Sequence, residues 1–426
     1  MSEKKKTLTF VGVAAGLLVL ALITAPRRVT PTAFNDQGQP FFPEFKDPLT
    51  ATSLEVIDYD EATGSAQPFK VQLKDGKWTI PSHHNYPADG KDRLAKTAAA
   101  VIDIKKDDFR SDNVSDHEGC GVVDPLDEKA ASLKGRGKRV TIKGAGEQVL
   151  ADFIIGKPIE GRDGFRFVRV PGQKRVYAAR MNIDISTKFS DWIEADLLQV
   201  NKDDIQQVVL KDYSIDERRG IVNQRDVIVL DKKESDWLAN NMRSSEEVDK
   251  TKMNDFLTAL DGLAIVGVRL KPAGLSESLE KSSSGVMLSQ SDMLSLQSKG
   301  YYFTPNGQLL SNEGELQATT KDGVIYTLRF GEVVYGQGEA VTAGSDSLAP
   351  PPGSGPAENR YLFITTSFDP KQLPAEPKKP RNTDFASKPN DLNTRFARWY
   401  YVISSASFDK LHLTRRDLVK PKTKTS

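Results

Sequence analysis

A repeated order of segments constrains the fold of this chain more than any other feature of its sequence. Residues 53–60 (SLEVIDYD) and 69–73 (FKVQL) flank a polar turn and have the composition of two strands in a hairpin. Residues 204–212 (DIQQVVLKD) and 226–230 (DVIVL) repeat this arrangement further along the chain. The period is far longer than that of a solenoid repeat, so the pattern predicts two tandem, duplicated domains.

A tryptophan, an aspartate and an apolar helix follow each hairpin. Trp78 and Trp237 are 159 residues apart, and Asp89 and Asp249 are 160 residues apart. We interpret the tryptophans as core anchors that close each hairpin against its helix, and the aspartates as helix N-caps. The apolar side chains recur at helical spacing, at Leu94, Ala98, Val101 and Ile102 in the first copy and at Met253, Phe256, Leu257 and Leu260 in the second.

Later segments with strand-like composition complete each copy. The expected fold class is therefore α+β, with mostly antiparallel sheet and one main helix in each domain, over residues 51–200 and 201–420. The further segments are 139–144, 149–157, 165–170 and 175–180 in the first copy, and 314–323, 324–332, 360–366 and 398–404 in the second.

Polar stretches separate or decorate these units. Residues 29–50 contain several Pro and Phe residues without periodicity and are predicted to be a tether. In the second copy, 275–296 is rich in Ser, 342–358 contains SDSLAPPPGSGP, and 369–390 is rich in Pro and Lys. We expect all three to be flexible surface insertions. Residues 421–426 are expected to be a solvated tail.

The N-terminus carries an uncharged run of 18 residues, Leu8–Ala25, preceded by three lysines at positions 4–6. As a helix this run spans about 27 Å, close to the hydrocarbon thickness of a bilayer. It is either a cleaved signal peptide or a retained anchor. The sequence favours a retained anchor, because Ile23 and Pro26 are unfavourable around a cut after Ala25.

Residues 1–28 are accordingly predicted to form a cytoplasmic tip and a transmembrane anchor. Because Arg27 and Arg28 follow the span, the positive-inside bias of the lysines before it is small. We expect a single-pass protein of the cytoplasmic (inner) membrane with its N-terminus inside. The bulk of the chain is then extracytoplasmic.

Composition limits the partners of the remaining chain. The 426 residues carry a formal charge of +1, with 38% hydrophobic and 27% charged side chains, as in an ordinary globular body. This balance provides no basic field for nucleic acid, which we do not expect as a partner. The single cysteine, Cys120, excludes an intramolecular disulfide and any multi-cysteine zinc site.

Two of the four histidines are adjacent in WTIPSHHNYPADG, residues 78–90. A zinc site needs at least three protein ligands, and consecutive side chains on a strand point to opposite faces. His83 and His84 would therefore need further ligands, for which His117 and Cys120 in SDHEGCG are the candidates. The alternative is a polar connection, which we favour because the corresponding stretch of the second copy has no histidine.

Motifs of catalysis are missing from the sequence. It contains no GxSxG elbow, no HExxH helix and no paired CxxC. We therefore predict a protein that is not an enzyme, with no catalytic residue, no cofactor and no established metal ligand.

The order of motifs resembles the domain of unknown function family numbered 4340. The likeness rests on W-x-I and YPAD before a helix (78–89), GVVDP (121–125), a strand ending at Ile155–Gly156, and Val176–Tyr177. It covers residues 53–198 well and the second copy more loosely, and it is greatest to planctomycete members. The resemblance implies a bacterial envelope protein with one anchor, and some relatives are auxiliary components of ABC transporters, near gliding-motility-type exporters. It implies no catalytic residue.

Three functions follow as hypotheses. The leading one is an extracytoplasmic interaction module, held at the membrane by residues 8–25, that serves as an auxiliary subunit beside an ABC permease. The alternative is a solute- or glycan-binding protein that uses the groove between the two copies. The third is a metal-dependent hydrolase centred on His83, His84, His117 and Cys120.

Overall fold

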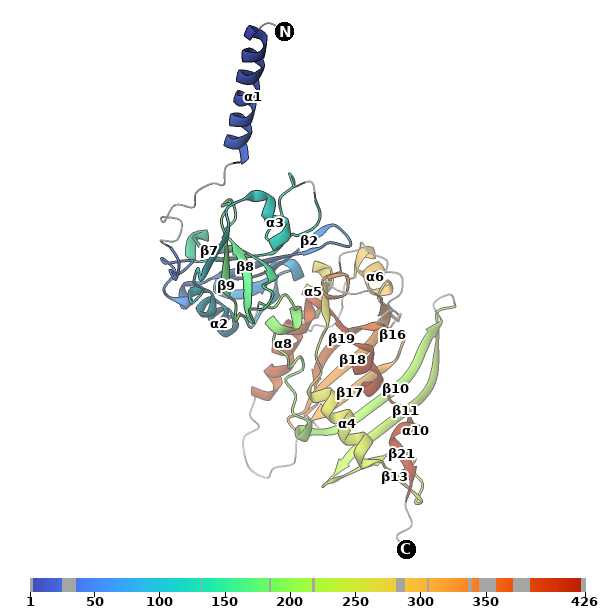
Figure 1. The fold of residues 1–426 in the computed structure, drawn as a ribbon. Coiled ribbons are helices and arrows are strands. Elements are labelled where there is room, and N and C mark those ends of the chain that lie inside the picture. Colours follow the sequence, from blue (N-terminus) through green and yellow to red (C-terminus); the bar gives the residue numbers. More distant parts are fainter. Residues whose placement is uncertain are drawn as a thin grey trace.

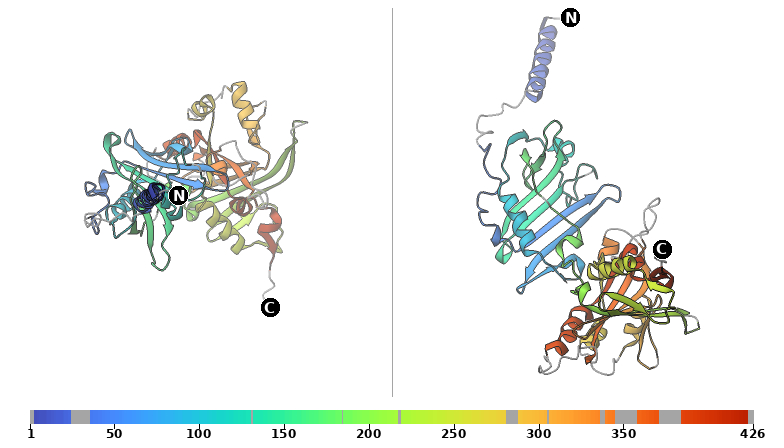
Figure 2. Two further views of the ribbon diagram at one scale, coloured as in Figure 1. Left: turned by 45° about the horizontal axis from the view of Figure 1, so that its top comes forward. Right: turned by 90° about the horizontal axis from the view of Figure 1, so that it is seen from below.

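The computed structural model describes residues 3–24, 36–130, 132–183, 185–216, 219–280, 288–304, 306–335, 339–344, 358–370 and 384–422. Within these residues the chain forms two large antiparallel sheets with helices packed against them (Figure 1). The sheets belong to two adjoining bodies, as the further views in Figure 2 show. The predicted α+β class with mostly antiparallel sheet is confirmed.

The first sheet begins with the predicted hairpin. In chain order its strands are β1 (Ser53–Asp60), β2 (Ser65–Lys74), β3 (Lys77–Ile80), β4 (Tyr86–Pro87), β5 (Asp108–Ser111), β6 (Lys138–Lys143), β7 (Val149–Pro158), β8 (Phe165–Arg169) and β9 (Val176–Arg180). They are arranged β4-β3-β2-β1-β6-β7-β8-β9-β5, and neighbouring strands are antiparallel. Helix α2 (Lys91–Ile102) buries Leu94, Ala98 and Val101 in the same core as the inward side chains of β1 and β6.

The second sheet is also covered by an apolar helix. In chain order its strands are β10 (Ile205–Asp216), β11 (Ile221–Lys233), β12 (Asp236–Ala239), β14 (Gly267–Leu270), β17 (Glu315–Thr320), β18 (Val324–Val334), β19 (Asn359–Phe368) and β20 (Trp399–Ile403). They are arranged β12-β11-β10-β17-β18-β19-β20-β14, again antiparallel. Helix α4 (Lys250–Asp261) buries Met253, Phe256 and Leu260 against it.

The two sheets have the same strand order and differ at one edge. The run β3-β2-β1-β6-β7-β8-β9-β5 corresponds position by position to β12-β11-β10-β17-β18-β19-β20-β14. In the first sheet, β4 pairs with β3 and forms the edge. In the second, the strand at the same place before the helix, β13 (Glu246–Val248), pairs with β21 (Val419–Pro421) instead. Strand β12 is therefore the edge of the second sheet.

The two helices start differently, although an aspartate precedes each. Asp249 caps α4 as predicted, because its carboxylate accepts hydrogen bonds from two backbone N–H groups of the first turn, at 3.0 and 3.2 Å. The prediction for Asp89 is wrong, since Gly90 is the N-cap of α2 and no side chain caps that helix. A Cβ at Gly90 would lie 3.0 Å from Val71 and 3.4 Å from Trp78, so the hairpin approaches the helix start closely.

The segment 275–296, predicted to be a flexible insertion, instead contributes to a second core. Its ends lie in helices α5 (Ala273–Glu280) and α6 (Gln290–Gln297), where Leu275 and Leu296 are buried. With the hairpin β15 (Tyr301–Phe303) and β16 (Leu309–Ser311), these helices cover the second sheet's other face. The expectation failed because the Ser-rich composition conceals a few apolar side chains whose partners are distant in sequence. Residues 281–287 lie outside the described residues.

The other predicted insertions are described only in part. Residues 345–357 and 371–383 lie outside the described residues, and so do residues 423–426 of the predicted tail. For residues 384–390 the prediction of a flexible insertion is wrong. These residues belong to helix α8 (Asp384–Ala397), which buries Phe396 in the main core. The remaining helices are α3 (His117–Cys120), α7 (Glu339–Thr342), α9 (Ser405–Leu411) and α10 (Arg415–Leu418).

The predicted tether is folded from residue 36 onward. Phe41 and Phe45 are buried, and the ring of Phe41 meets Tyr177 edge-on at 5.3 Å. The Tyr177 hydroxyl donates a hydrogen bond to Asp36, and burial raises the pKa of Tyr177 to about 12. The tether was predicted because these aromatic residues lack periodicity, yet the first sheet provides a surface that covers them. Residues 25–35 lie outside the described residues.

Helix α1 (Glu3–Thr24) stands apart from both sheets (Figure 1). Within the part of the chain that is described, no helix reaches the length and apolar character needed to cross a membrane. The predicted anchor extends beyond that part, since Ala25 and the side chains at 8–10 and 22–24 are outside it.

Candidate functional site

The stretch 78–90 makes a tight return at the edge of the first sheet. Strand β3 ends where Pro81 follows, because proline has no backbone N–H for the ladder. A 3₁₀ turn (Pro81–His83) and two left-handed residues, His84 and Asn85, both at φ 58°, then reverse the chain. Strand β4 can therefore pair with β3. The predicted polar connection between strand and helix is present here.

His83 is held in place from several directions. Only 4% of its surface is exposed, and its ring stacks on Phe189 with centroids 4.4 Å apart and 4° between the planes. Its Nδ1 lies 2.9 Å from the Ser82 hydroxyl, and its Nε2 lies 2.8 Å from the Thr342 hydroxyl. Both ring nitrogens are thus used for hydrogen bonds with hydroxyl groups.

The electrostatic surroundings keep the His83 ring neutral. Its pKa is lowered to about 4, mainly by burial and to a smaller extent by the nearby charges of His84 and Arg269. A neutral imidazole can donate from one nitrogen and accept at the other, which suits its two hydroxyl partners. At pH 7 this side chain is a packing and hydrogen-bonding group.

Two neighbours of His83 also contact the second body. The Nε2 of His84 donates a hydrogen bond to the backbone oxygen of Ala343 at 2.8 Å. The ring of Tyr86 meets Trp399 of β20 edge-on, with centroids 4.9 Å apart. We call these contacts, together with the bond from His83 to Thr342, the junction. The stretch 78–90 therefore joins the two sheets.

The connector between the sheets, residues 181–200, packs against the junction. It includes a 3₁₀ turn (Phe189–Trp192), in which both aromatic rings are buried. Trp192 donates its indole N–H to the backbone oxygen of Ser186 at 2.9 Å. From the second sheet's side, Arg395 donates to the backbone oxygen of Asp196 at 3.1 Å. The connector is thus fixed to both bodies.

A groove of about 430 Å³ opens beside the junction. Phe69, His83 and Phe189 line it from the first body, and Val266 and Thr342 line it from the second. The two phenylalanines are only 5% and 3% exposed, so their ring faces are covered by neighbouring side chains. This groove lies where the solute-binding alternative requires one, but it offers little open ring surface for stacking.

The other two candidate ligands have different surroundings. His117 Nε2 donates a hydrogen bond to the backbone oxygen of Lys174 at 2.8 Å. Burial raises the pKa of the Cys120 thiol, which disfavours the thiolate that a metal would need. Among the described residues, no three His, Cys, Asp or Glu side chains form a group suited to a metal ion. The structure does not bring His83, His84, His117 and Cys120 together.

The two tryptophans lie at the margins of the core. Both are partly exposed and pack against its buried side chains, Trp78 beside the start of α2 and Trp237 beside α4. Each one lies between hairpin and helix as predicted, but it is not enclosed. The exposed part of Trp237 faces a cavity.

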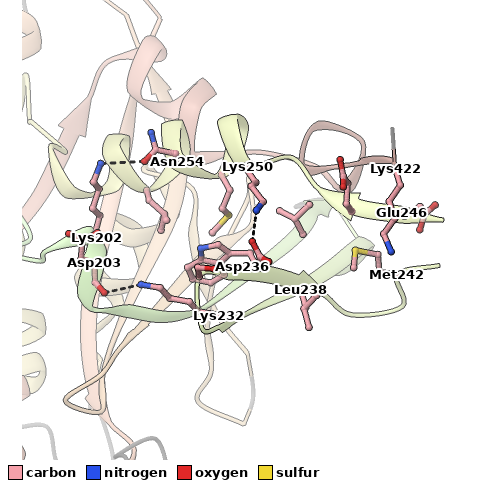
Figure 3. A pocket seen from close by; sticks show the side chains of 16 residues that line it. Lys202, Asp203, Lys232, Asp236, Leu238, Met242, Glu246, Lys250, Asn254 and Lys422 are labelled. Carbon is pink, nitrogen blue, oxygen red and sulfur yellow. Dashed lines mark hydrogen bonds and ion pairs between the residues drawn. The ribbon is translucent and has the colours of Figure 1, made fainter. Parts of the chain in front are cut away.

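This cavity, which we call the edge groove, has a volume of about 500 Å³ and lies beside β12 (Figure 3). Strands β12 and β13 and helix α4 surround it. Sequence reasoning missed the edge groove, because its lining comes from segments that are distant in the chain. Its apolar residues are Trp237, Leu238, Met242, Val248, Met253 and Leu257, and its lysines are Lys202, Lys232, Lys250 and Lys422.

The geometry describes an α+β protein of two like-ordered sheets, fastened by a junction and with a groove at one sheet edge. Residues 78–278 match the family described as Domain of unknown function (DUF4340). This match confirms the family resemblance found in the sequence. The match begins at Trp78 and continues through α4 into α5. No curated protein and no solved structure matches the chain.

Proposed function

We propose that this chain is a non-enzymatic interaction module, anchored in the cytoplasmic membrane and exposed on its outer side, and an auxiliary subunit of an ABC-type transport system. One observation carries the anchor: α1 exposes apolar side chains all round, because these positions are spread over the full turn of a helix. The residues are Val11, Val13, Leu17, Leu18, Val19 and Leu20, each between 54% and 64% exposed. A helix of this kind needs an apolar medium, and the uncharged run 8–25 has the length for a bilayer.

The two bodies are proposed to be products of a duplication. Their identical strand order supports this, together with the similar spacing of tryptophan and aspartate in both halves. In such a protein one copy is free to change where the other keeps the common plan. The different pairing of β4, which binds to β3, and of β13, which binds to β21, is one such change.

The membrane location is tested by washing isolated membranes with alkaline carbonate. The full chain is expected to stay with the membranes, whereas Leu17→Arg combined with Leu18→Arg is expected to move it several-fold toward the soluble fraction, because arginine is costly within a bilayer. The control is Leu49→Arg, at a position that is 71% exposed and outside α1. Release of the unaltered chain by carbonate would contradict the anchor.

The transport partner is tested by purification of the full chain from detergent-solubilised membranes. Recovery together with one permease and its ATPase is the expected result. The family resemblance supports it, since some relatives are auxiliary components of ABC transporters. Repeated recovery of the chain alone would count against the proposal.

The groove beside the junction supports a second candidate, a solute- or glycan-binding protein. Its volume of about 430 Å³ falls within the range of small-molecule sites. Chito- and malto-oligosaccharides are then expected to raise the unfolding temperature of the full chain, but not that of Val266→Trp, which fills the groove. If the unaltered chain gains no stability from either sugar series, this candidate fails.

A further inference from the structure

The space beside β12 is the place that β4 occupies in the first sheet. There, β4 pairs with β3 just before helix α2 begins. In the second sheet β13 has the same place in the chain but pairs with β21, a strand near the end of the chain. The edge groove lies between β12 and β13. One strand position of the common plan is therefore unfilled.

The backbone of β12 has unused hydrogen-bonding groups on that side. Residues of an antiparallel pair alternate between bonded and non-bonded positions. Asn240 N–H bonds to Val229 O and β12 pairs with β11 in continuous register, so Leu238 and Asp236 bond inward. Trp237 and Ala239 then direct their N–H and C=O groups outward. Within the described residues, no backbone partner is found for them on the outer side.

The side chains of the edge groove suit an extended peptide with an apolar middle. The partly exposed side chains of Trp237 and Met242 provide the open apolar surface, whereas Met253 and Leu257 also line the groove but are only 1% and 8% exposed. Leu238 also lines the groove, although its side chain leaves the opposite face of β12 (Figure 3), and it is 45% exposed. A strand laid along β12 would alternate its side chains between these two faces.

The charges at the ends of the groove favour an acidic occupant. The Nζ atoms of Lys202, Lys232 and Lys422 bond to Thr258 Oγ1, the Asp203 backbone oxygen and the Ser244 backbone oxygen, at 3.1, 3.0 and 2.8 Å. In the described part of the chain, none of these three has a carboxylate within 4.0 Å. Figure 3 shows Lys202 and Lys232 at one end of the groove and Lys422 at the other.

By contrast, three of the four acidic side chains that line the groove have basic partners. Asp236 pairs with Lys250 at 2.6 Å, while Glu246 and Glu247 each have a basic nitrogen at 4.0 Å. The positive charge of the three lysines is therefore only partly offset. A ligand that carries carboxylates at both ends would complement it.

We propose that the edge groove binds an extended acidic peptide segment of a partner protein, which pairs with β12 as an added strand. This inference rests on the proposed interaction role and specifies where and how the partner docks. Backbone hydrogen bonds from Trp237 and Ala239 provide affinity, the apolar floor selects alternate apolar side chains, and the lysines select acidic flanks.

The test uses the full chain in detergent and a fluorescent peptide with glutamates at both ends and alternating valine and threonine between them. Its fluorescence anisotropy is expected to rise on binding. A peptide with lysines in place of the glutamates should not bind, and methylation of alternate backbone nitrogens should abolish binding. Absence of binding, or equal binding of the lysine and methylated peptides, would overturn the proposal.

A protein variant adds an independent test. The affinity for the glutamate peptide should fall about tenfold in the triple variant Lys202→Gln, Lys232→Gln, Lys422→Gln, because each lysine contact contributes about 0.5 kcal/mol. The matched control replaces the exposed lysines Lys74, Lys77 and Lys91 near the filled edge of the first sheet and should leave affinity unchanged. Equal affinity in the groove variant, or pairing of two copies through β12 in sedimentation, would overturn the proposal.

The two proposals fail separately. If the permease and its ATPase co-purify with the chain but the peptide does not bind, the interaction role stands and the docking mode falls. If the chain is recovered alone from membranes but the peptide binds as described, the groove stands and the transport partner falls.

Discussion

The His83 side chain is a neutral ring between two hydroxyl groups, with one face on Phe189. Its pKa of about 4 in the folded chain is well below the value near 6.5 expected after unfolding. As pH falls, the unfolded chain therefore takes up this proton first. The contribution of His83 to stability is complete above pH 6.5 and is lost between about pH 6.5 and 4.

This titration is visible in a comparison of variants. We compare the free energies of unfolding of the unaltered chain and of His83→Gln. The advantage of the unaltered chain is expected to decrease by about 3 kcal/mol from pH 7 to pH 4. Urea unfolding at both pH values measures it. An unchanged difference for His83→Gln would show that the ring is accessible to protons in the folded chain.

Lys271 is a second buried group that can be tested. Its Nζ donates to the backbone oxygen of Phe396 at 3.1 Å and lies 3.8 Å from the centre of the Phe363 ring. Among the described residues no carboxylate pairs with it, and burial holds its pKa well below 10.5. The unfolded chain keeps the proton to higher pH, so stability rises with pH until the unfolded lysine also titrates.

The substitution Lys271→Met retains most of the buried stem and removes this dependence. At pH 7 the variant is expected to be as stable as the unaltered chain or about 1 kcal/mol more stable, because a buried amine without an acidic partner is costly. Between pH 7 and 10 the free energy of unfolding of the unaltered chain, measured with urea, should rise relative to that of Lys271→Met. A loss of more than about 2 kcal/mol at pH 7 would mean that the bond to Phe396 dominates.

At the level of elements, local patterns predicted what depends on local periodicity. The predicted strand 53–60 has the bounds of β1, and the apolar spacing of α2 and α4 is that of the observed helices. Which strand forms the edge of the second sheet could not be predicted, since β13 pairs with β21, which is distant in the sequence. The same holds for the candidate sites. The sequence predicts a polar connection at the adjacent histidines, but their bonds to Thr342 and Ala343 depend on how two distant segments meet.

The two helix starts provide a matched pair of substitutions. Asp249→Ala is expected to lower the free energy of unfolding by about 1 kcal/mol, because two N–H groups of α4 lose their acceptor. Asp89→Ala should change it by less than about 0.5 kcal/mol, since α2 has no side-chain cap. Denaturant unfolding measures both. Lys420→Ala separates the cap from the 3.1 Å ion pair of Asp249 with Lys420. Equal losses at the two aspartates would contradict this account.

In the whole molecule, the junction determines how far the two bodies behave as one. Helix α1 lies at the end that carries the first sheet, and strand β21 lies at the other end (Figure 1). A force or partner that acts on the second sheet therefore reaches the first sheet through the junction and the connector. The buried rings of Phe189 and Trp192 hold that connector closed.

Tyr86 tests this coupling. Tyr86→Ala removes the ring that meets Trp399 and is expected to cost about 3 kcal/mol and to increase proteolytic cleavage within residues 181–200 several-fold. Tyr86→Phe keeps the ring and should resemble the unaltered chain. Limited proteolysis followed by mass measurement of the fragments gives the cleavage site. If both variants resist cleavage equally, the junction is not what orders the connector.

The unfilled edge of β12 has a consequence for contacts between copies of the chain at high local concentration, as the proposed anchoring in a membrane would create. A bare strand edge attracts any other edge, including that of an identical neighbour. Here each neighbour would bring its own Lys202, Lys232 and Lys422 to the same gap. Like charges then keep copies apart over roughly 8 Å at physiological ionic strength. High salt screens these charges, so for the proposed membrane-anchored chain we expect edge-to-edge pairing of copies to increase with ionic strength.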